Sequence, residues 1–177
     1  GMIGASCVMD PVTFLEEVET LEGNGVSVDG RLLVSGKVNL THPGYRLLER
    51  KKEIDLGAGR IGTTGRGIGP TYVHKFQRNA IRLEDALDPG LFRELTTYHT
   101  ARISRMLNLS ESQKEELQAM EDRFTESALL AARYCSDVSA KVFGILSRDG
   151  RIIAEGAQGT LLDPDHGSYP FVTCGQC

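Results

Sequence analysis

The chain has 177 residues, of which 40% are hydrophobic and 25% are charged, and this composition suits one globular domain with a sizeable core. Its formal net charge of -4 argues against a general nucleic-acid-binding protein, but it allows a small anionic ligand to be held locally. No apolar run approaches the roughly 18 residues of a membrane-spanning helix, and the N-terminus lacks the basic and apolar regions of a signal peptide. We therefore expect a cytoplasmic protein that binds neither nucleic acid nor membranes.

The first third of the chain has the pattern of a β-α-β unit. Residues 2–9 predict a short buried strand, and Asp10-Pro11 predicts the N-cap and first position of a helix that ends at Gly23-Asn-Gly25. Residues 31–35 predict a second strand, and residues 43–52 predict a weak helix. The fold class is therefore α/β, with a mostly parallel sheet that binds ligands at the carboxyl ends of its strands.

A glycine-rich, basic stretch follows this unit. Six glycines lie between Gly57 and Gly69, and no Asp or Glu occurs from Leu56 to Leu83. The same window supplies hydroxyls and five cations, namely Arg60, Arg66, Lys75, Arg78 and Arg82. Close-approaching backbone N–H groups, hydroxyls and cations without a nearby carboxylate favour a phosphate site. The alternative is a solvated surface loop that is merely basic, and neither the Walker A pattern nor the dinucleotide G-x-G-x-x-G pattern is present.

Residues from about 89 to 148 predict a helical subregion. Asp88-Pro89 predicts the start of a helix whose apolar residues, including Leu91, Phe92 and Met106, face inward, and Asn108-Leu-Ser110 predicts its end. Ser110 and Gln113 form a capping-box pattern, and apolar spacing of three and four predicts a second helix from 112 to 147, straight or kinked. We expect a helical hairpin packed on its own domain, and a coiled-coil partner surface is the alternative.

The last part of the chain predicts a ligand-binding loop after a strand. Asp149-Gly150 predicts a turn, and residues 151–155 predict a buried strand that leads into glycine-rich sequence. The amide of Gln158 either reads a base edge or stabilises a turn. Asp163, Asp165 and His166 have the composition of a metal or acid/base cluster, but tight-turn chemistry explains them and is preferred, so no metal ligand is assigned.

The four cysteines include a C-x-x-C pair at Cys174 and Cys177. A zinc site needs a second pair, which Cys7 and Cys135 do not form, and a redox pair usually sits at a helix start. We expect reduced thiols near a chain end, and the sequence assigns no role to the Cys174/Cys177 pair.

Two motifs resemble those of adenylosuccinate synthetase. The first is Ile61-Gly-Thr-Thr-Gly-Arg-Gly-Ile-Gly-Pro70, continuing through Tyr72, Lys75 and Arg78 at the spacing of the family signature. The second is Glu155-Gly-Ala-Gln-Gly-Thr-Leu-Leu-Asp163 with Asp165-His-Gly-Ser-Tyr-Pro-Phe-Val-Thr173. They occur in the order and at about the separation of the family, so residues 1–177 are expected to form one partial domain similar to the middle of the family protein.

This resemblance implies a ligase of purine and AMP biosynthesis. The family joins IMP and aspartate to give adenylosuccinate, using GTP and Mg²⁺, through a 6-phosphoryl-IMP intermediate. The working unit is a homodimer built on a large, mostly parallel sheet with flanking helices, into which the helical hairpin is inserted.

The motif positions also imply roles for single residues. Thr64 and Thr173 would bind the phosphate of IMP, and Gln158 would contact its base near the reacting O6. Arg78 would reach the IMP of the partner subunit across the dimer interface. Lys75 would lie near the reacting groups, so Lys75 and Gln158 are the catalytic candidates.

The resemblance also implies that the GTP loop, the catalytic Asp and His, and the aspartate- and guanine-binding segments of the family lie outside this sequence. Where the family has a Ser-Ser-Asn-Thr-Thr-like run, this chain has Cys174-Gly-Gln-Cys177. We therefore expect the chain to be inactive in isolation. The alternative is a truncated homologue that binds a purine nucleotide such as IMP, or that dimerises, without catalysis.

Overall fold

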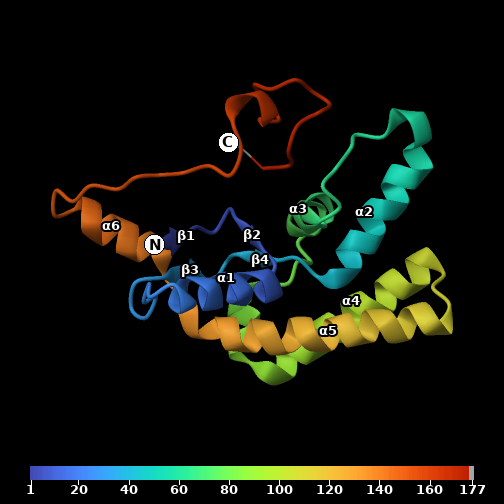
Figure 1. The fold of residues 1–177 in the computed structure, drawn as a ribbon, viewed down its shortest axis with the longest axis horizontal. Helices are drawn as coiled ribbons and strands as arrows, with labels where there is room; N and C mark the ends of the chain where they lie inside the picture. The colour runs from blue at the N-terminus through green and yellow to red at the C-terminus, as the bar shows by residue number, and fades with distance from the viewer. Residues whose placement is uncertain (176–177) are drawn as a thin grey trace.

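A computed structural model describes residues 1–175 of the chain. The chain folds into short strands and longer helices (Figure 1). The strands are β1 (Met2–Ile3), β2 (Val8–Met9), β3 (Leu33–Ser35), β4 (Asn39–Leu40) and β5 (Cys135–Ser136). The α-helices are α1 (Pro11–Gly23), α2 (Pro43–Leu56), α3 (Ile68–Phe76), α4 (Pro89–Leu107), α5 (Glu111–Ala131) and α6 (Val138–Leu146). The 3₁₀ helices are η1 (Gly57–Gly59), η2 (Leu83–Leu87), η3 (Ala132–Tyr134) and η4 (Thr160–Leu162).

The strands pair in parallel, which confirms the predicted fold class. One sheet has the order β1-β3-β5, with Ile3 opposite Val34 and Val34 opposite Cys135, and β2 pairs with β4 in a second sheet. The expected strand over residues 2–9 is thus two separate pieces, because residues 4–7 form a turn closed by the Cys7 N–H on the Gly4 carbonyl. Among the described residues, no helix is long and apolar enough to cross a membrane.

Helix α1 begins and ends where the sequence predicts. The Asp10 carboxylate accepts a hydrogen bond from the Val12 N–H at 3.0 Å, and Pro11 occupies the first helical position. The helix ends at Gly23, and Gly25 has a φ of 78°. Phe14 and Val18 are buried, so this helix covers one side of the core.

Helices α4 and α5 form the predicted helical hairpin, and α5 lies side by side with α1 (Figure 1). Asn108, in the left-handed region, ends α4, and Ser110 with Gln113 forms the predicted capping box of α5. Phe92 and Phe124 stack across the hairpin with ring centroids 5.9 Å apart. The expected inward face of α4 was wrong at Leu91 and Met106, which are exposed.

The predicted single helix over 112–147 was wrong. Helix α5 ends at Ala131, and after η3 the chain forms β5 beside β3 before α6 begins. Asp137 caps α6 by accepting a hydrogen bond from the Ala140 N–H at 2.9 Å. The strand was missed because its inward-facing Cys135 and the buried Val138 of the next helix happen to continue the helical spacing of apolar residues.

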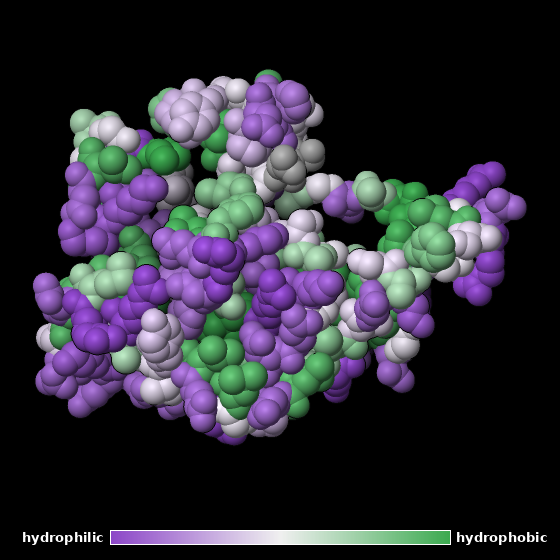
Figure 2. Space-filling model, turned by 180° about the vertical axis from the view of Figure 1, so that it is seen from behind, coloured by the Kyte–Doolittle hydropathy of each residue, from purple (hydrophilic) through white to green (hydrophobic). Residues whose placement is uncertain are grey.

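The strand predicted over 151–155 was also wrong. The segment is extended but forms no ladder with any strand of residues 1–175, and the side chain of Ile153 is 96% exposed. In Figure 2 a projecting lobe carries hydrophobic residues on its surface. Two residues of α6, Phe143 and Leu146, are exposed. A strand needs a hydrogen-bonding neighbour as well as an apolar sequence, and this segment has none in the described part of the chain.

Removal of the Phe124 ring tests how much the packing between α4 and α5 contributes to the free energy of unfolding. Phe124→Ala should lower the free energy of unfolding by about 3–5 kcal/mol, because the ring is 2% exposed and leaves a cavity beside Phe92. Leu130→Ala on the same helix is the control, since Leu130 is 61% exposed and should change stability by no more than about 0.5 kcal/mol. Urea unfolding followed by circular dichroism measures both values, and equal losses would contradict the assigned packing.

Candidate functional site

The glycine-rich stretch forms a loop that leads into helix α3, a helix that the sequence analysis did not predict. Its N-cap is Gly67, which lies in the left-handed region with a φ of 80°. A Cβ at Gly67 would lie 3.1–3.2 Å from atoms of Thr41, Tyr45 and Arg46, so this glycine permits a close approach to α2. Pro70 lies in the first turn, where a missing N–H breaks no helical hydrogen bond.

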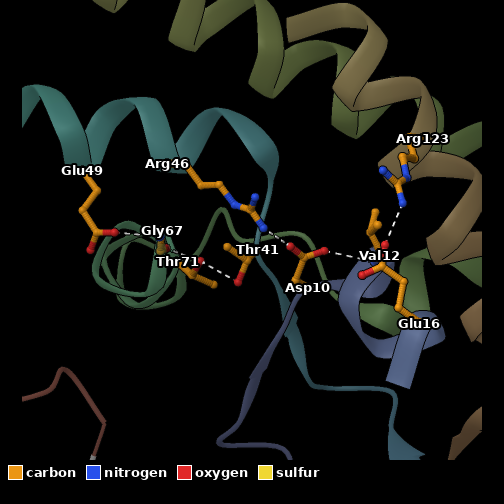
Figure 3. Close-up of polar contacts among 9 residues, drawn as sticks. All are labelled: Asp10, Val12, Glu16, Thr41, Arg46, Glu49, Gly67, Thr71 and Arg123. Carbon is orange, nitrogen blue, oxygen red and sulfur yellow. Dashed lines mark hydrogen bonds and ion pairs between the residues drawn. The ribbon is translucent and has the colours of Figure 1, made fainter. Parts of the chain in front are cut away.

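Two glutamates of α2 bind the backbone of this loop. Glu49 accepts a hydrogen bond from the Gly67 N–H at 2.7 Å (Figure 3). Glu53 accepts from the N–H groups of Ile61, Gly62 and Thr63 at 3.3, 2.8 and 3.3 Å. The stretch contains no acidic residue, but two carboxylates of α2 lie against it in the fold. These four N–H groups therefore already have hydrogen-bond acceptors within the protein.

Helix α2 is also tied to the start of α1. Arg46 forms an ion pair with Asp10, the residue that caps α1 (Figure 3). Beside it, the Thr71 hydroxyl donates to the Gly67 carbonyl at 2.8 Å and lies 3.2 Å from the Thr41 hydroxyl. Through the Arg46–Asp10 and Glu49–Gly67 contacts, the beginnings of α1 and α3 are both held to helix α2.

A pocket of about 340 Å³ brings together three of the predicted site residues. Thr64 comes from the loop, whereas Gln158 and Thr173 come from the C-terminal segment that lies over α3 (Figure 1). Glu49, Ile68 and Phe171 are among the other lining residues. Both walls thus offer hydroxyls, and the C-terminal wall adds an amide and an aromatic ring.

Lys75 and Arg78 do not line this pocket. The Nζ of Lys75 lies 5.6 Å from the centroid of the Tyr72 ring, and the Tyr72 hydroxyl donates to the Ser6 carbonyl. Arg78 is exposed just beyond the end of α3, with a φ of 64°. Their assigned roles remain predictions.

The Asp163 segment has the turn chemistry that the sequence analysis preferred. The buried carboxylate of Asp163 accepts hydrogen bonds from the N–H groups of Asp165 and His166 at 2.8 and 3.0 Å. Cys174 is an exposed free thiol beside Gly69, and partial desolvation together with the charge of Glu49 raises its pKa. Cys177 lies outside the described residues, so the Cys174/Cys177 pair is not described.

Sequence reasoning missed a buried cluster of histidines beneath the loop. His42, the N-cap of α2, accepts from the Gly44 N–H through Nδ1 and contacts the Thr100 hydroxyl through Nε2 at 3.2 Å. The Tyr45 ring stacks on His74 with centroids 4.6 Å apart, and its hydroxyl lies 3.0 Å from Nδ1 of His99. Three of the four histidines of the chain meet here, from elements that are distant in sequence.

Burial keeps these histidines neutral. Desolvation, reinforced by neighbouring histidines, lowers the pKa of His42 from 6.5 to about 3. Desolvation and the charge of His74 lower the pKa of His99 to about 4, although a hydrogen bond to the Asn79 backbone opposes this. Desolvation likewise lowers the pKa of His74. The cluster therefore supports the loop from below as a packed group of uncharged side chains.

The parallel strands, the flanking helices and the pocket between a glycine-rich loop and a C-terminal segment define an α/β protein with a pocket of small-molecule size. The family model for adenylosuccinate synthetase matches residues 1–177. The adenylosuccinate synthetases of Ralstonia pickettii and Porphyromonas gingivalis are 38% and 41% identical, over 99% and 97% of this chain. The chain belongs to the adenylosuccinate synthetase family.

The chain spans 40% of the length of these relatives. Among solved structures, that of fully ligated adenylosuccinate synthetase from Plasmodium falciparum is similar with a TM-score of 0.86 and 27% identity. That match covers 99% of this chain and 40% of the other. The described fold therefore corresponds to a part of the family fold.

The histidine cluster predicts a loss of stability in acid. The pKa values of His42 and His99 are about 3 and 4 in the folded protein, and 6.5 in the unfolded chain. Their contribution to stability is therefore fully present above pH 6.5 and declines as the pH falls from 6.5 toward the folded-state values. Each of these histidines should remove about 1.4 kcal/mol per pH unit in that range. Urea unfolding at a series of pH values measures the slope.

His99→Gln should flatten that slope by about one proton equivalent, because the variant removes one group that titrates only on unfolding. His166→Gln is the control, since His166 lies outside the cluster. An unchanged slope in His99→Gln would show that His99 is not held neutral in the folded protein.

Proposed function

We propose that this chain is the IMP-binding part of an adenylosuccinate synthetase. The observation that carries the proposal is the convergence of Thr64, Gln158 and Thr173 on one pocket, although about 100 residues separate the first from the last. Its volume of about 340 Å³ lies in the range of ligand sites. Thr64 and Thr173 offer hydroxyls to the phosphate, and the Gln158 amide offers a donor and an acceptor to the hypoxanthine near O6.

The proposed activity is the GTP-dependent joining of IMP to aspartate, with adenylosuccinate as the product. In this proposal the chain binds and orients IMP: the hydroxyls fix the phosphate end, and Gln158 fixes the base so that O6 faces the phosphoryl donor. Lys75 lies close to the reacting groups once the site is complete. Arg78, exposed beyond α3, reaches the IMP of the second subunit in a homodimer.

The proposal assigns GTP and Mg²⁺ to other parts of the family protein. Mg²⁺ would neutralise the phosphates during phosphoryl transfer. Within residues 1–175, no group of three or more His, Cys, Asp or Glu side chains is placed to hold a metal ion. The proposal assigns no Mg²⁺ ligand to the described residues and routes no step through the metal.

Calorimetric titration of the purified chain tests the IMP site. The chain should bind IMP saturably, with GTP as the comparison ligand, and Gln158→Ala or Thr64→Ala should weaken IMP binding about tenfold, as expected for losing a hydrogen bond in a pocket. The controls are Gln118→Ala and Thr20→Ala, since both residues are exposed on helices away from the pocket. The absence of IMP binding by the parent chain, or equal losses in the controls, would overturn the proposal.

Turnover is expected to require the rest of the family protein. The chain alone, given IMP, aspartate, GTP and Mg²⁺, should form no adenylosuccinate, because phosphoryl transfer needs positioned phosphates, metal and base together. A full-length relative assayed in parallel is the control. Product formation by this polypeptide alone would contradict the expectation, and IMP binding without turnover even beside complementary segments would favour the non-catalytic homologue.

A further inference from the structure

The loop between Ile61 and Gly67 is bound at both ends by one helix. Glu49 and Glu53 are four residues apart on α2 and therefore share one face of it. Glu53 receives three consecutive N–H groups, and Glu49 receives the Gly67 N–H that precedes α3. Hydrogen bonds from N–H groups to carboxylates are among the stronger ones in proteins, so this glutamate pair fixes a loop that glycine leaves free to vary.

The Glu53 contact has the form of an anion site. Successive backbone N–H groups that converge on one point make a concavity that binds anions, and here the anion is a side chain of the protein itself. Gly62, with a φ of 79°, supplies the left-handed residue that aims its neighbours' N–H groups together. The loop amides are thus engaged before any ligand arrives.

The two glutamates lie on different sides of the loop. Gly62 and Thr63 line both the 340 Å³ pocket and a second pocket of about 670 Å³, so the loop is the wall between them. Glu53 lines only the larger pocket, together with Arg50 and Arg60. Glu49 lines only the smaller pocket. Glu53 therefore approaches the loop from the face opposite Gln158 and Thr173.

The charge of Glu53 is stabilised where it lies. Desolvation would raise the pKa of its carboxyl, but hydrogen bonds from Gly62, Thr63 and Ile61, with the positive charge of Arg60, together lower it below 4.5. The carboxylate is consequently ionised at neutral pH. It can hold the loop without leaving an unpaired acid facing the nucleotide pocket.

We propose that Glu49 and Glu53 are positioning residues that hold the glycine loop in the shape in which Thr63 and Thr64 line the nucleotide pocket. The assignment rests on the proposed IMP site. Because Glu53 binds the Ile61, Gly62 and Thr63 amides from the face away from the nucleotide pocket, and Glu49 binds the Gly67 amide, the phosphate is received by the threonine hydroxyls. The glutamate pair touches no reacting atom and acts through the loop.

Backbone amide exchange and amide proton shifts of the full chain, without nucleotide, give the first test. Glu53→Gln should raise the exchange rates of Gly62 and Thr63 about tenfold and move their shifts upfield, because an amide oxygen accepts less strongly than a carboxylate. Glu49→Gln should change Gly67 instead. This reciprocal pattern separates direct loop positioning from a general loss of stability, which would affect both ends alike.

The second test is IMP titration of the same variants. Glu53→Gln should weaken IMP binding about tenfold, as for the loss of a charge-assisted hydrogen bond, and Glu53→Asp should restore part of it. Asp55→Asn is the matched control, since Asp55 is an exposed carboxylate of the same helix that pairs with Lys51. Unchanged or tighter binding in Glu53→Gln would overturn the inference, and tighter binding would identify Glu53 as a competitor of the phosphate.

The two proposals fail in different ways. If the parent chain binds no IMP, the proposed function is overturned, and amide exchange then decides whether the glutamate pair shapes the loop. If the parent chain binds IMP but exchange at residues 61–63 is the same in Glu53→Gln, the function stands and the positioning role is overturned.

Discussion

The neutral imidazole of His42 is the interaction on which the arrangement of helices depends. It caps α2 through the Gly44 N–H, contacts the Thr100 hydroxyl of α4, and packs against the Phe124 ring of α5. A charged ring could not accept the Gly44 hydrogen bond and would be costly to bury. The position of α2 relative to the helical hairpin therefore depends on an uncharged side chain.

From that start, α2 determines the geometry of the candidate site. Tyr45 packs beneath α3, Arg46 pairs with the cap of α1, and Glu49 and Glu53 bind the loop in succession along the helix. Residues three and four apart in a helix share a face. A regular helix thus imposes its spacing on a loop that has little conformational preference of its own, and the loop in turn presents Thr64 to the pocket.

The sequence predicts well those features that local chemistry decides. Asp10-Pro11 and Ser110 with Gln113 mark real helix starts, because capping satisfies N–H groups within a few residues. It predicts poorly what distant partners decide. Cys135-Ser136 becomes a strand because β3 lies beside it, and Ile152-Ile153 pairs with no strand among residues 1–175 despite its apolar character. The acid-free stretch from Leu56 to Leu83 receives its carboxylates from α2, a contact that no inspection of the stretch itself reveals.

The candidate site likewise has features that the sequence predicts and features that it does not. Thr64, Gln158 and Thr173 were identified from motifs, and they do line one pocket, but composition alone would not have paired them. The buried histidines carry no local signal, since each belongs to a different helix or its cap.

The exposed segment 151–155 determines how the two walls of the pocket are connected. It joins α6 to the wall that holds Gln158 and Thr173, and it does so without strand pairing in the described chain. The two walls are therefore connected by a tether rather than by a continuous sheet. A molecule that touches both walls adds contacts between them, so its binding stabilises the position of the C-terminal segment against the loop by mass action.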